Sequence, residues 1–308
     1  MTYMPVGYGD PRPKYANGHV FDRFNTDDLE TVRFYIVHCE RRNLAFSTIC
    51  AKLLKLSALA EGTGKARLFE LDAEQIETYL DGLTGLDGGA IKATSRKATV
   101  SAFRSFYKWA VDFEHTNRDP MTKVVTPRVG RRLPSPMTEN DYDLAVAAAP
   151  TPTMRLWVML AGSAGLRVSE IAGLVWSRVD LYGRTINVIG KGDKERVVPM
   201  TVALARDLHV HQGLRTESDS VFTEPVFGRP YSAHIVSTYL GRYLREIGLD
   251  NRPHDLRHRF ATEACESSGD IRAVQELMGH ESIETTAVYT LVRDKRKRGV
   301  VDGMRDAA

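Results

Sequence analysis

The sequence predicts a mainly α-helical protein with a small antiparallel β-sheet, divided into two domains. Apolar residues recur with a period near 3.6 over most of the chain, which is typical of amphipathic helices. Two short β-branched runs flank a loop of glycine, lysine and aspartate at residues 190–194, which is typical of a β-hairpin. The 308 residues are enough for about two domains. We therefore expect a helical domain followed by a mixed α/β domain.

The segment before residue 24 is rich in proline and glycine and has no apolar core beside a cleavage site. It is therefore not a signal peptide, and residues 1–23 are expected to form a flexible arm. Residues 24–115 are expected to fold as a domain of four helices. Asp72 with Gln75 predicts a capping box that opens a helix over residues 73–83.

The last helix of this domain is expected over residues 94–113. Its apolar face consists of Val100, Phe103, Phe106, Tyr107 and Trp109. Its opposite face is basic and carries Arg96, Lys97, Arg104 and Lys108. On charge alone, such a face is either ordinary solvated surface or a contact for a polyanion.

Residues 116–136 are predicted to form an interdomain linker, because four prolines exclude a helix and stiffen the segment. This linker is basic and contains Lys123, Arg128, Arg131 and Arg132. The net charge of the chain is +3. Residues 1–135 hold 20 basic and 16 acidic side chains, whereas residues 136–308 hold 22 and 23. The positive surplus therefore falls on the first domain and the linker, where it can follow a phosphate backbone.

Residues 137–308 are expected to form the second domain, with a C-terminal tail over residues 291–308. Strands are predicted at 184–189 and 195–199, with a short third strand at 179–181, and helices fill most of the rest. Three unevenly spaced cysteines do not favour a disulfide framework and fit a reducing cytosol. No apolar run approaches the ~20 residues of a membrane span, so no membrane partner is expected.

Five short islands of this domain hold residue types that can act on a phosphodiester. They are Arg167 with Glu170, Lys191, His254 with Arg257, Gly279 with His280, and Tyr289. An arginine can fork onto two phosphate oxygens. A lysine in a glycine-flanked loop can protonate a leaving oxygen, although spacing does not separate Lys191 from Lys194. Each island alone also fits an ordinary structural role, so the set as a whole carries the hypothesis.

A zinc site is the competing interpretation of one island. His254 and His258 are four residues apart, as in the zinc helix of a metalloprotease. The glutamate of that motif is replaced by Asp255, and Arg257 would repel a cation. The arginines, lysine, histidines and tyrosine of the five islands can together act on a phosphodiester without a metal ion. We therefore expect no metal and no cofactor.

In order, spacing and local sequence, the five islands resemble the tyrosine recombinase (phage integrase) family. The resemblance covers residues 136–290, and its carriers are AGLRVSEI at 164–171, GKGDKER at 190–196, HDLRHRFAT at 254–262, LMGHESI at 277–283, Thr285, Thr286 and Tyr289. A weaker resemblance links SAFRSFYKWA at 101–110 to the last helix of the family's core-binding domain.

The resemblance implies a covalent mechanism. Tyr289 would attack the scissile phosphate to form a 3′-phosphotyrosyl link and release a 5′ hydroxyl. Lys191 would be the general acid for the 5′ oxygen, and His254 would assist proton transfer at the nucleophile.

The resemblance also implies a binding site for the phosphate itself. Arg167, Arg257 and His280 would hold the non-bridging oxygens and stabilise charge on the pentacoordinate phosphorus. Glu170 would support the face formed by His254 and Arg257 without touching DNA.

The family's fold implies a C-shaped clamp in which both domains wrap double-stranded DNA at an attachment site. The basic helix and linker would then contact phosphates. A homotetramer would act on two duplexes, with a dimer on each, and an accessory excision or DNA-bending factor is an expected partner. We expect an integrase that inserts and excises phage or mobile-element DNA in the cytoplasm of a bacterial host, associated with its nucleoid. Only about 25 residues precede the first helix, too few for an arm-binding domain, so a simple integrase is expected.

Three other functions compete with this interpretation. Within the family, a cellular recombinase that resolves dimers differs only in its sites and partner. A type IB topoisomerase shares the chemistry, but the core-binding half of the chain argues against it. A non-catalytic helix-turn-helix regulator fits the pattern of residues 271–288 but has no use for the five islands as a set.

Overall fold

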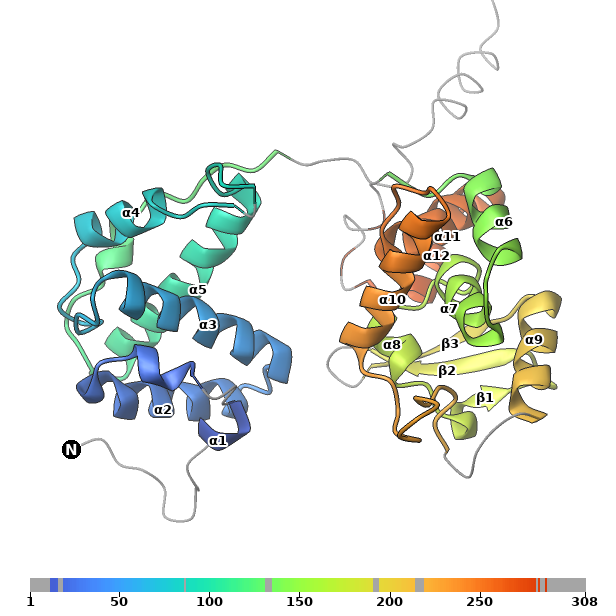
Figure 1. The fold of residues 1–308 in the computed structure, drawn as a ribbon, viewed down its shortest axis with the longest axis horizontal. Helices are drawn as coiled ribbons and strands as arrows, with labels where there is room; N and C mark the ends of the chain where they lie inside the picture. Colours follow the sequence, from blue (N-terminus) through green and yellow to red (C-terminus); the bar gives the residue numbers. More distant parts are fainter. Residues whose placement is uncertain are drawn as a thin grey trace, which may run out of the picture. The chain divides into compact units, whose positions relative to one another are not determined.

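The computed structural model describes residues 12–15, 19–85, 87–130, 135–190, 194–213, 219–280, 282 and 286. The chain divides into two compact units, Met1–Arg131 and Arg132–Ala308, which are coloured along the sequence in Figure 1. Each unit has its own apolar core. The described residues are mainly helical with a three-stranded antiparallel sheet, which confirms the predicted fold class.

The first unit is built from helices. They are α1 (Arg12–Tyr15), α2 (Thr26–Arg41), α3 (Phe46–Gly62), α4 (Ala73–Asp81) and α5 (Ala93–Asp112), with single 3₁₀ turns at Phe21–Arg23 and Pro120–Thr122. The capping box at α4 is confirmed, since Gln75 N–H donates to Asp72 Oδ1 at 2.8 Å and Asp72 N–H donates back to Gln75 Oε1 at 2.9 Å. Local sequence thus sets where this helix begins.

The long helix α5 supplies much of this unit's core. Its predicted apolar face is buried, with Val100, Phe103, Phe106 and Tyr107 fully inaccessible to solvent. The helix packs against α2 and α3, and the Phe106 ring meets the edge of Tyr35 at 5.2 Å between centroids. Each fully buried aromatic side chain contributes roughly 2–3 kcal/mol through its removal from water.

Two segments expected to lie outside the first domain contribute to its core. Tyr15, within the expected arm, is buried, stacks on Phe46 at 5.1 Å and donates from its hydroxyl to Glu40 Oε1 at 2.8 Å. Met121 and Val124, within the expected linker, are also buried. Composition marks proline-rich segments as irregular, but it does not show that single apolar side chains within them find a pocket.

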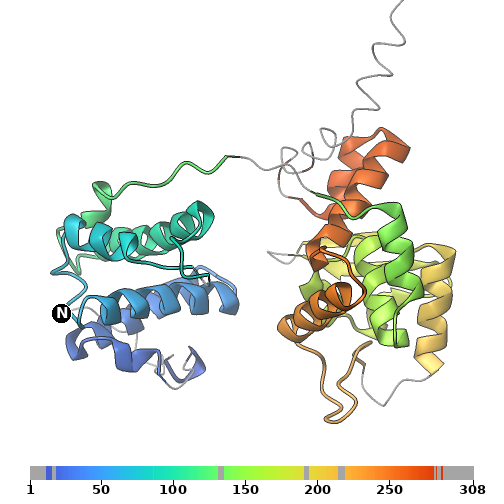
Figure 2. The ribbon, with the colours of Figure 1, turned by 45° about the horizontal axis from the view of Figure 1, so that its top comes forward.

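The second unit surrounds the buried helix α7 (Pro152–Gly162), whose residues 156–162 are buried on all sides. The other helices of this unit are α6 (Glu139–Ala147), α8 (Val168–Ala172), α9 (Val202–Gly213), α10 (Ala233–Glu246), α11 (Pro253–Ser268) and α12 (Ile271–Met278), with a 3₁₀ turn at Trp176–Arg178. Helices α6, α9, α10 and α11 contact α7, as Figures 1 and 2 show.

The sheet has the strand order β1-β2-β3, formed by β1 (Val179–Asp180), β2 (Thr185–Ile189) and β3 (Glu195–Pro199). These strands confirm the predicted hairpin and its short third strand. Ile189 pairs with Glu195 and Val188 with Arg196, and Gly190 N–H donates to Lys194 O at 2.8 Å at the base of the loop. Lys191, in that loop, lies outside the described residues.

Gly165 shapes the turn that leads into α8. Its φ is +65°, and a Cβ placed there would lie 2.3 Å from the ring of Phe260. Replacing Gly165 by alanine is expected to destabilise the second unit by about 2 kcal/mol or more, from left-handed backbone strain and displacement of that ring. Urea unfolding measures the loss. Gly248→Ala is the matched control, because Gly248 has a φ of +82° but open space around the added Cβ. Equal losses in the two variants would contradict the steric account.

Candidate active site

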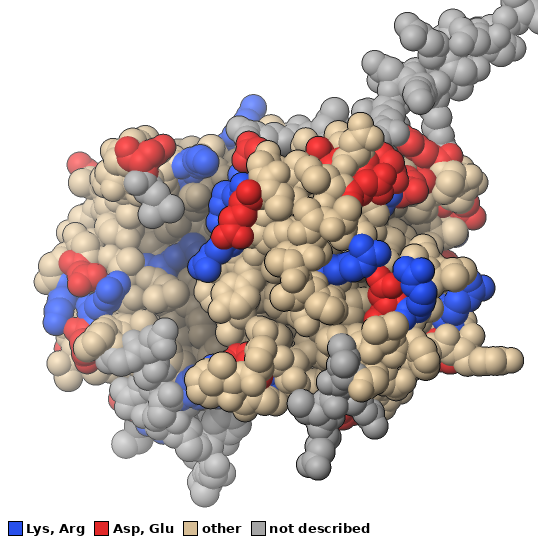
Figure 3. Space-filling model, turned by 45° about the vertical axis from the view of Figure 1, so that its right-hand side comes forward, with Lys and Arg blue, Asp and Glu red and all other residues tan. Residues whose placement is uncertain are grey.

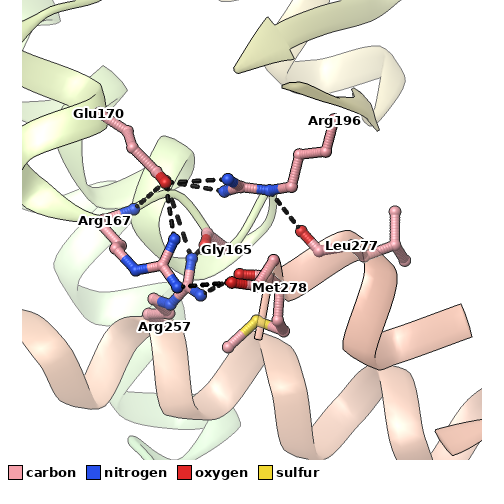
Figure 4. A network of polar contacts seen from close by, with 8 residues as sticks. Gly165, Arg167, Glu170, Arg196, Arg257, Leu277 and Met278 are labelled. Carbon is pink, nitrogen blue, oxygen red and sulfur yellow. Dashed lines mark hydrogen bonds and ion pairs between the residues drawn. The ribbon is translucent and has the colours of Figure 1, made fainter. Parts of the chain in front are cut away.

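Glu170 on α8 contacts all three of the arginines drawn in Figure 4. Its side chain is buried, and Oε2 accepts from the backbone N–H of Arg167 at 2.7 Å. Its other oxygen, Oε1, accepts from the side chain of Arg167 at 2.8 Å. Glu170 therefore caps the start of its own helix and holds the guanidinium that the sequence places three residues earlier.

Arg167 is the most exposed of the three arginines around Glu170. Its side chain is 34% accessible, compared with 9% for Arg196 and 2% for Arg257. Its Nη2 donates to the backbone carbonyl of Gly279 at 3.0 Å. Arg167 is thus fixed at both ends and still presents part of a cation to solvent, as a phosphate ligand requires.

Arg257 is buried on α11 and joins three segments. Its Nη1 donates to the carbonyl of Gly165 and lies 3.8 Å from Glu170 Oε2. Its Nη2 donates to the carbonyl of Met278 at the end of α12. The negative charge of Glu170 and these carbonyl dipoles offset the cost of burying the guanidinium.

Arg196 also contacts Glu170, and the sequence analysis did not count it among the site residues. Its two Nη atoms donate to both carboxylate oxygens, at 2.9 and 2.7 Å, and its Nε donates to the carbonyl of Leu277 at 2.8 Å. The only sequence signal was its place at the end of the GKGDKER motif. Arg196 and Glu170 are 26 residues apart in the chain, so helical spacing could not indicate their contact.

Three histidines accompany the arginines. The rings of His254 and His258 on α11 meet edge to face at 4.4 Å between centroids. His280 follows the C-cap glycine of α12, and its Nδ1 lies 2.9 Å from the hydroxyl of Thr286. Gly279 has a φ of +58° and forms the left-handed C-cap of α12. Burial and neighbouring positive charge lower the pKa of His254, and lower the pKa of His258 and His280 to about 4.

The lowered histidine pKa values predict acid sensitivity. In the folded state His258 and His280 stay neutral down to about pH 4, whereas in the unfolded chain they take up protons below their ordinary pKa of about 6.5. The unfolded state thus binds more protons in this window, and stability falls as the pH drops from about 6.5 to about 4.

The melting temperature of the protein, followed from pH 7.5 to pH 5, measures this loss. His258→Gln is expected to flatten the dependence, and the same change at exposed His209 is expected to leave it unchanged. An equally steep dependence in His258→Gln would show that His258 does not contribute to it.

The described part of the site brings together residues from three of the five predicted islands. Arg167 and Glu170, His254 and Arg257, and Gly279 with His280 converge on one face of the second unit. Arginine charges outnumber the single carboxylate between them, so the site favours an anion. Tyr289, like Lys191, lies outside the described residues.

The residues predicted to bind DNA differ in their surroundings. Arg96 is held by Asp81 and Glu77, at 2.7 and 2.6 Å. Arg104 donates to Thr126 Oγ1 at 2.8 Å and to the carbonyls of Met121 and Val124. These two arginines fasten α5 to neighbouring segments of the first unit, and a phosphate would compete with those contacts. Arg104 is nevertheless exposed, as are four further members of the predicted set, Lys97, Lys108, Lys123 and Arg128.

Arg131 and Arg132, the other predicted linker contacts, lie outside the described residues. On the face drawn in Figure 3, the coloured basic side chains alternate with acidic ones and do not gather in one large patch. Among the described residues, no group of three or more His, Cys, Asp and Glu side chains is placed to hold a metal ion. The helices within the described ranges include none that is long and apolar enough to cross a membrane.

Comparison with known proteins identifies relatives over most of the chain. Residues 136–296 match the model of the phage integrase family. The tyrosine recombinase XerC of Pelobacter propionicus is 33% identical over 294 residues, which cover 89% of this chain and 94% of that protein. The tyrosine recombinase XerD of Lacticaseibacillus casei is 34% identical over 206 residues, covering 62% of this chain and 70% of that protein.

Solved structures share the fold. A XerH recombinase bound to a palindromic difH substrate in a post-cleavage complex matches with a TM-score of 0.68 and 20% identity, covering 95% of this chain and 92% of that one. A lambda integrase fragment, solved as a dimer on a COC′ core site, also matches with a TM-score of 0.68 and 20% identity, covering 89% and 96% of the two chains.

Proposed function

The chain belongs to the phage integrase family, the tyrosine recombinases, which cleave and rejoin DNA at specific sites, and from this premise we propose that it is a Xer-type recombinase that resolves dimers of a cellular replicon. The relatives named XerC and XerD support this proposal, and the XerC match spans 89% of the chain. From the sequence alone, we expected integration of phage DNA first and dimer resolution second. These relatives favour the reverse order.

The observation that carries the catalytic proposal is the convergence of Arg167, Arg257 and His280 beside Glu170. Arg167 and Arg257 share the carboxylate, and both bond to carbonyls at the end of α12, directly before His280. A phosphate held here receives donors from α11, from the start of α8 and from the turn after α12 at once. Such preorganised donors stabilise the charge of a pentacoordinate phosphorus more than that of the ground state.

The reaction then proceeds by two transesterifications. The hydroxyl oxygen of Tyr289 attacks the scissile phosphorus, and the bond from phosphorus to the 5′ oxygen breaks. Lys191 gives a proton to that 5′ oxygen, and His254 helps to remove the proton of the tyrosine hydroxyl. A 5′ hydroxyl from the partner duplex reverses these steps, so that the phosphotyrosyl bond breaks and a new phosphodiester forms.

The partners follow from this chemistry. Each protomer carries one set of catalytic residues, and exchange between two duplexes cuts four strands. We therefore include a homotetramer on two DNA sites, with two protomers per duplex, in the proposal. An accessory DNA-bending or excision factor and a site of action in the cytoplasm of the bacterium are further parts of it.

Covalent trapping tests the proposal. Nicked duplexes tiled across the genome of the source cell are incubated with the protein in EDTA and separated on denaturing gels. An adduct at one duplex supports recombinase chemistry, and specific binding without any adduct would favour a regulator. The position of the site separates the two members of the family. A chromosomal site with no flanking element supports dimer resolution, whereas the ends of an inserted element support integration.

A further inference from the structure

Arg196 lies where three segments of the proposed site meet. It extends from β3, donates from its two Nη atoms to both carboxylate oxygens of Glu170 on α8, and donates from Nε to Leu277 O near the end of α12 (Figure 4). Its side chain is 9% accessible, so these contacts are shielded from water. One guanidinium thus connects the hairpin, the start of α8 and the turn that carries His280.

The fit around Arg196 is close on the side of α12. A Cβ added to Gly279 would lie 3.1 Å from Arg196 Nη1 and 3.2 Å from its Cδ. The glycine before His280 therefore provides the left-handed cap of α12 and also the space that this guanidinium occupies. Arg196 sets how near the His280 turn comes to the hairpin.

Arg196 is also close to the loop of the proposed general acid. It follows Lys194 by two residues and pairs with Val188 across the hairpin. The backbone bond from Gly190 to Lys194 closes the loop at 2.8 Å. Because the strand is stiff over this distance, a guanidinium anchored on Glu170 fixes the base of the loop that contains Lys191.

The contact also determines the charge of Glu170. Burial alone would raise the pKa of this carboxyl, but hydrogen bonds from Arg196 and from the backbone N–H of Arg167 lower it overall. The carboxylate therefore stays ionised and keeps its hold on Arg167. Removal of Arg196 leaves a buried carboxylate with fewer hydrogen-bond donors. This lowers the free energy of unfolding more than the loss of an exposed ion pair does.

We propose that Arg196 is a positioning residue for the recombination reaction, which couples the hairpin carrying the general acid to the phosphate-binding face. This inference rests on the proposed function. It assigns to Arg196 no contact with DNA, and it predicts a specific defect in protonating the leaving 5′ oxygen. A bridge with a purely structural role would affect every substrate to the same extent.

The test compares two leaving groups. Nicked duplexes bearing the trapped site are made with either an ordinary 5′ oxygen or a bridging 5′ sulfur at the scissile phosphate. A thiolate leaves without protonation, because its pKa is far below that of an alcohol. Cleavage rates at saturating DNA are measured for wild type, Arg196→Gln, Arg196→Lys and the control Arg155→Gln. Arg155 on α7 pairs with Asp207 on α9 at 2.7 Å, and its polar contacts among the described residues include neither Glu170 nor the hairpin.

Arg196→Gln is expected to slow cleavage of the oxygen substrate on the order of 10²-fold and to slow cleavage of the sulfur substrate much less, because only the need for protonation is removed there. Arg196→Lys keeps the positive charge but cannot form the bidentate contact. Its cleavage rate on the oxygen substrate is expected to fall between those of wild type and Arg196→Gln. Arg155→Gln is expected to match wild type. Equal slowing on both substrates, or no slowing, would overturn the proposal. Thermal unfolding checks folding, and if Arg196→Gln does not fold, the lysine variant decides. Failure of wild type to form an adduct with either substrate would instead refute the proposed function.

Discussion

Replacing Tyr289 by phenylalanine is expected to abolish the covalent DNA adduct and leave DNA binding unchanged. The substitution removes one oxygen atom, which is the proposed nucleophile, and keeps the aromatic ring. No other hydroxyl takes over, because the in-line geometry at phosphorus requires an oxygen at that position. Denaturing gels of reactions with the nicked site measure the adduct, and fluorescence anisotropy measures binding.

Tyr182 provides the matched control for this experiment. It lies on the surface of the same unit and is fully exposed. Tyr182→Phe is therefore expected to form the adduct at the wild-type rate. An adduct that persists in Tyr289→Phe would identify a different nucleophile and would refute the mechanism.

Replacing Arg257 by lysine is expected to slow cleavage by about 10²–10³-fold, the usual cost of losing one preorganised donor to a transition-state oxyanion. An ammonium keeps the charge but cannot serve two directions at once, as the Arg257 guanidinium does with Gly165 and Met278. The variant is also expected to unfold more readily, by about 1–3 kcal/mol for each buried carbonyl left without a donor. Single-turnover cleavage at saturating DNA and urea unfolding measure the two effects separately.

Arg206→Lys on α9 controls for arginine replacement as such, because Arg206 is exposed and bonds to its neighbour Asp207. Arg206→Lys is expected to leave the cleavage rate and the free energy of unfolding unchanged. A folded Arg257→Lys protein that cleaves as fast as wild type would remove Arg257 from the phosphate-binding set.

Local signals in the sequence predicted much of the fold. The capping pair Asp72 and Gln75 opens α4 as predicted. Local signals of the same kind are present where Thr138 caps α6 through the N–H of Asp141 and where Gly279 ends α12 in the left-handed region. The hairpin strands follow the β-branched runs on either side of residues 190–194. These features depend on residues within a few positions of one another, so a single sequence contains the information.

Contacts between distant segments could not be predicted in the same way. Arg167 and Glu170 are only three residues apart, so their ion pair is a local contact. Nothing local indicated that Arg196 donates to the same carboxylate or that Arg257 is fully buried. Likewise, the basic side chains of α5 were correctly predicted to lie opposite its buried face. The ion pairs of Arg96 with Glu77 and Asp81, however, depend on how α4 packs. Patterns of charge show which side chains are available, and tertiary packing decides which are already engaged.

Identification of the covalently modified residue tests the central claim most directly. The trapped adduct is digested with nuclease and then with trypsin, and the peptides are sequenced by mass spectrometry. Cleavage after Arg272 and Arg293 releases residues 273–293, in which Tyr289 is the only tyrosine. A nucleotide remnant on Tyr289 is the predicted result. A remnant on any other residue, including Ser282 or Thr286 of the same peptide, would contradict the proposed mechanism.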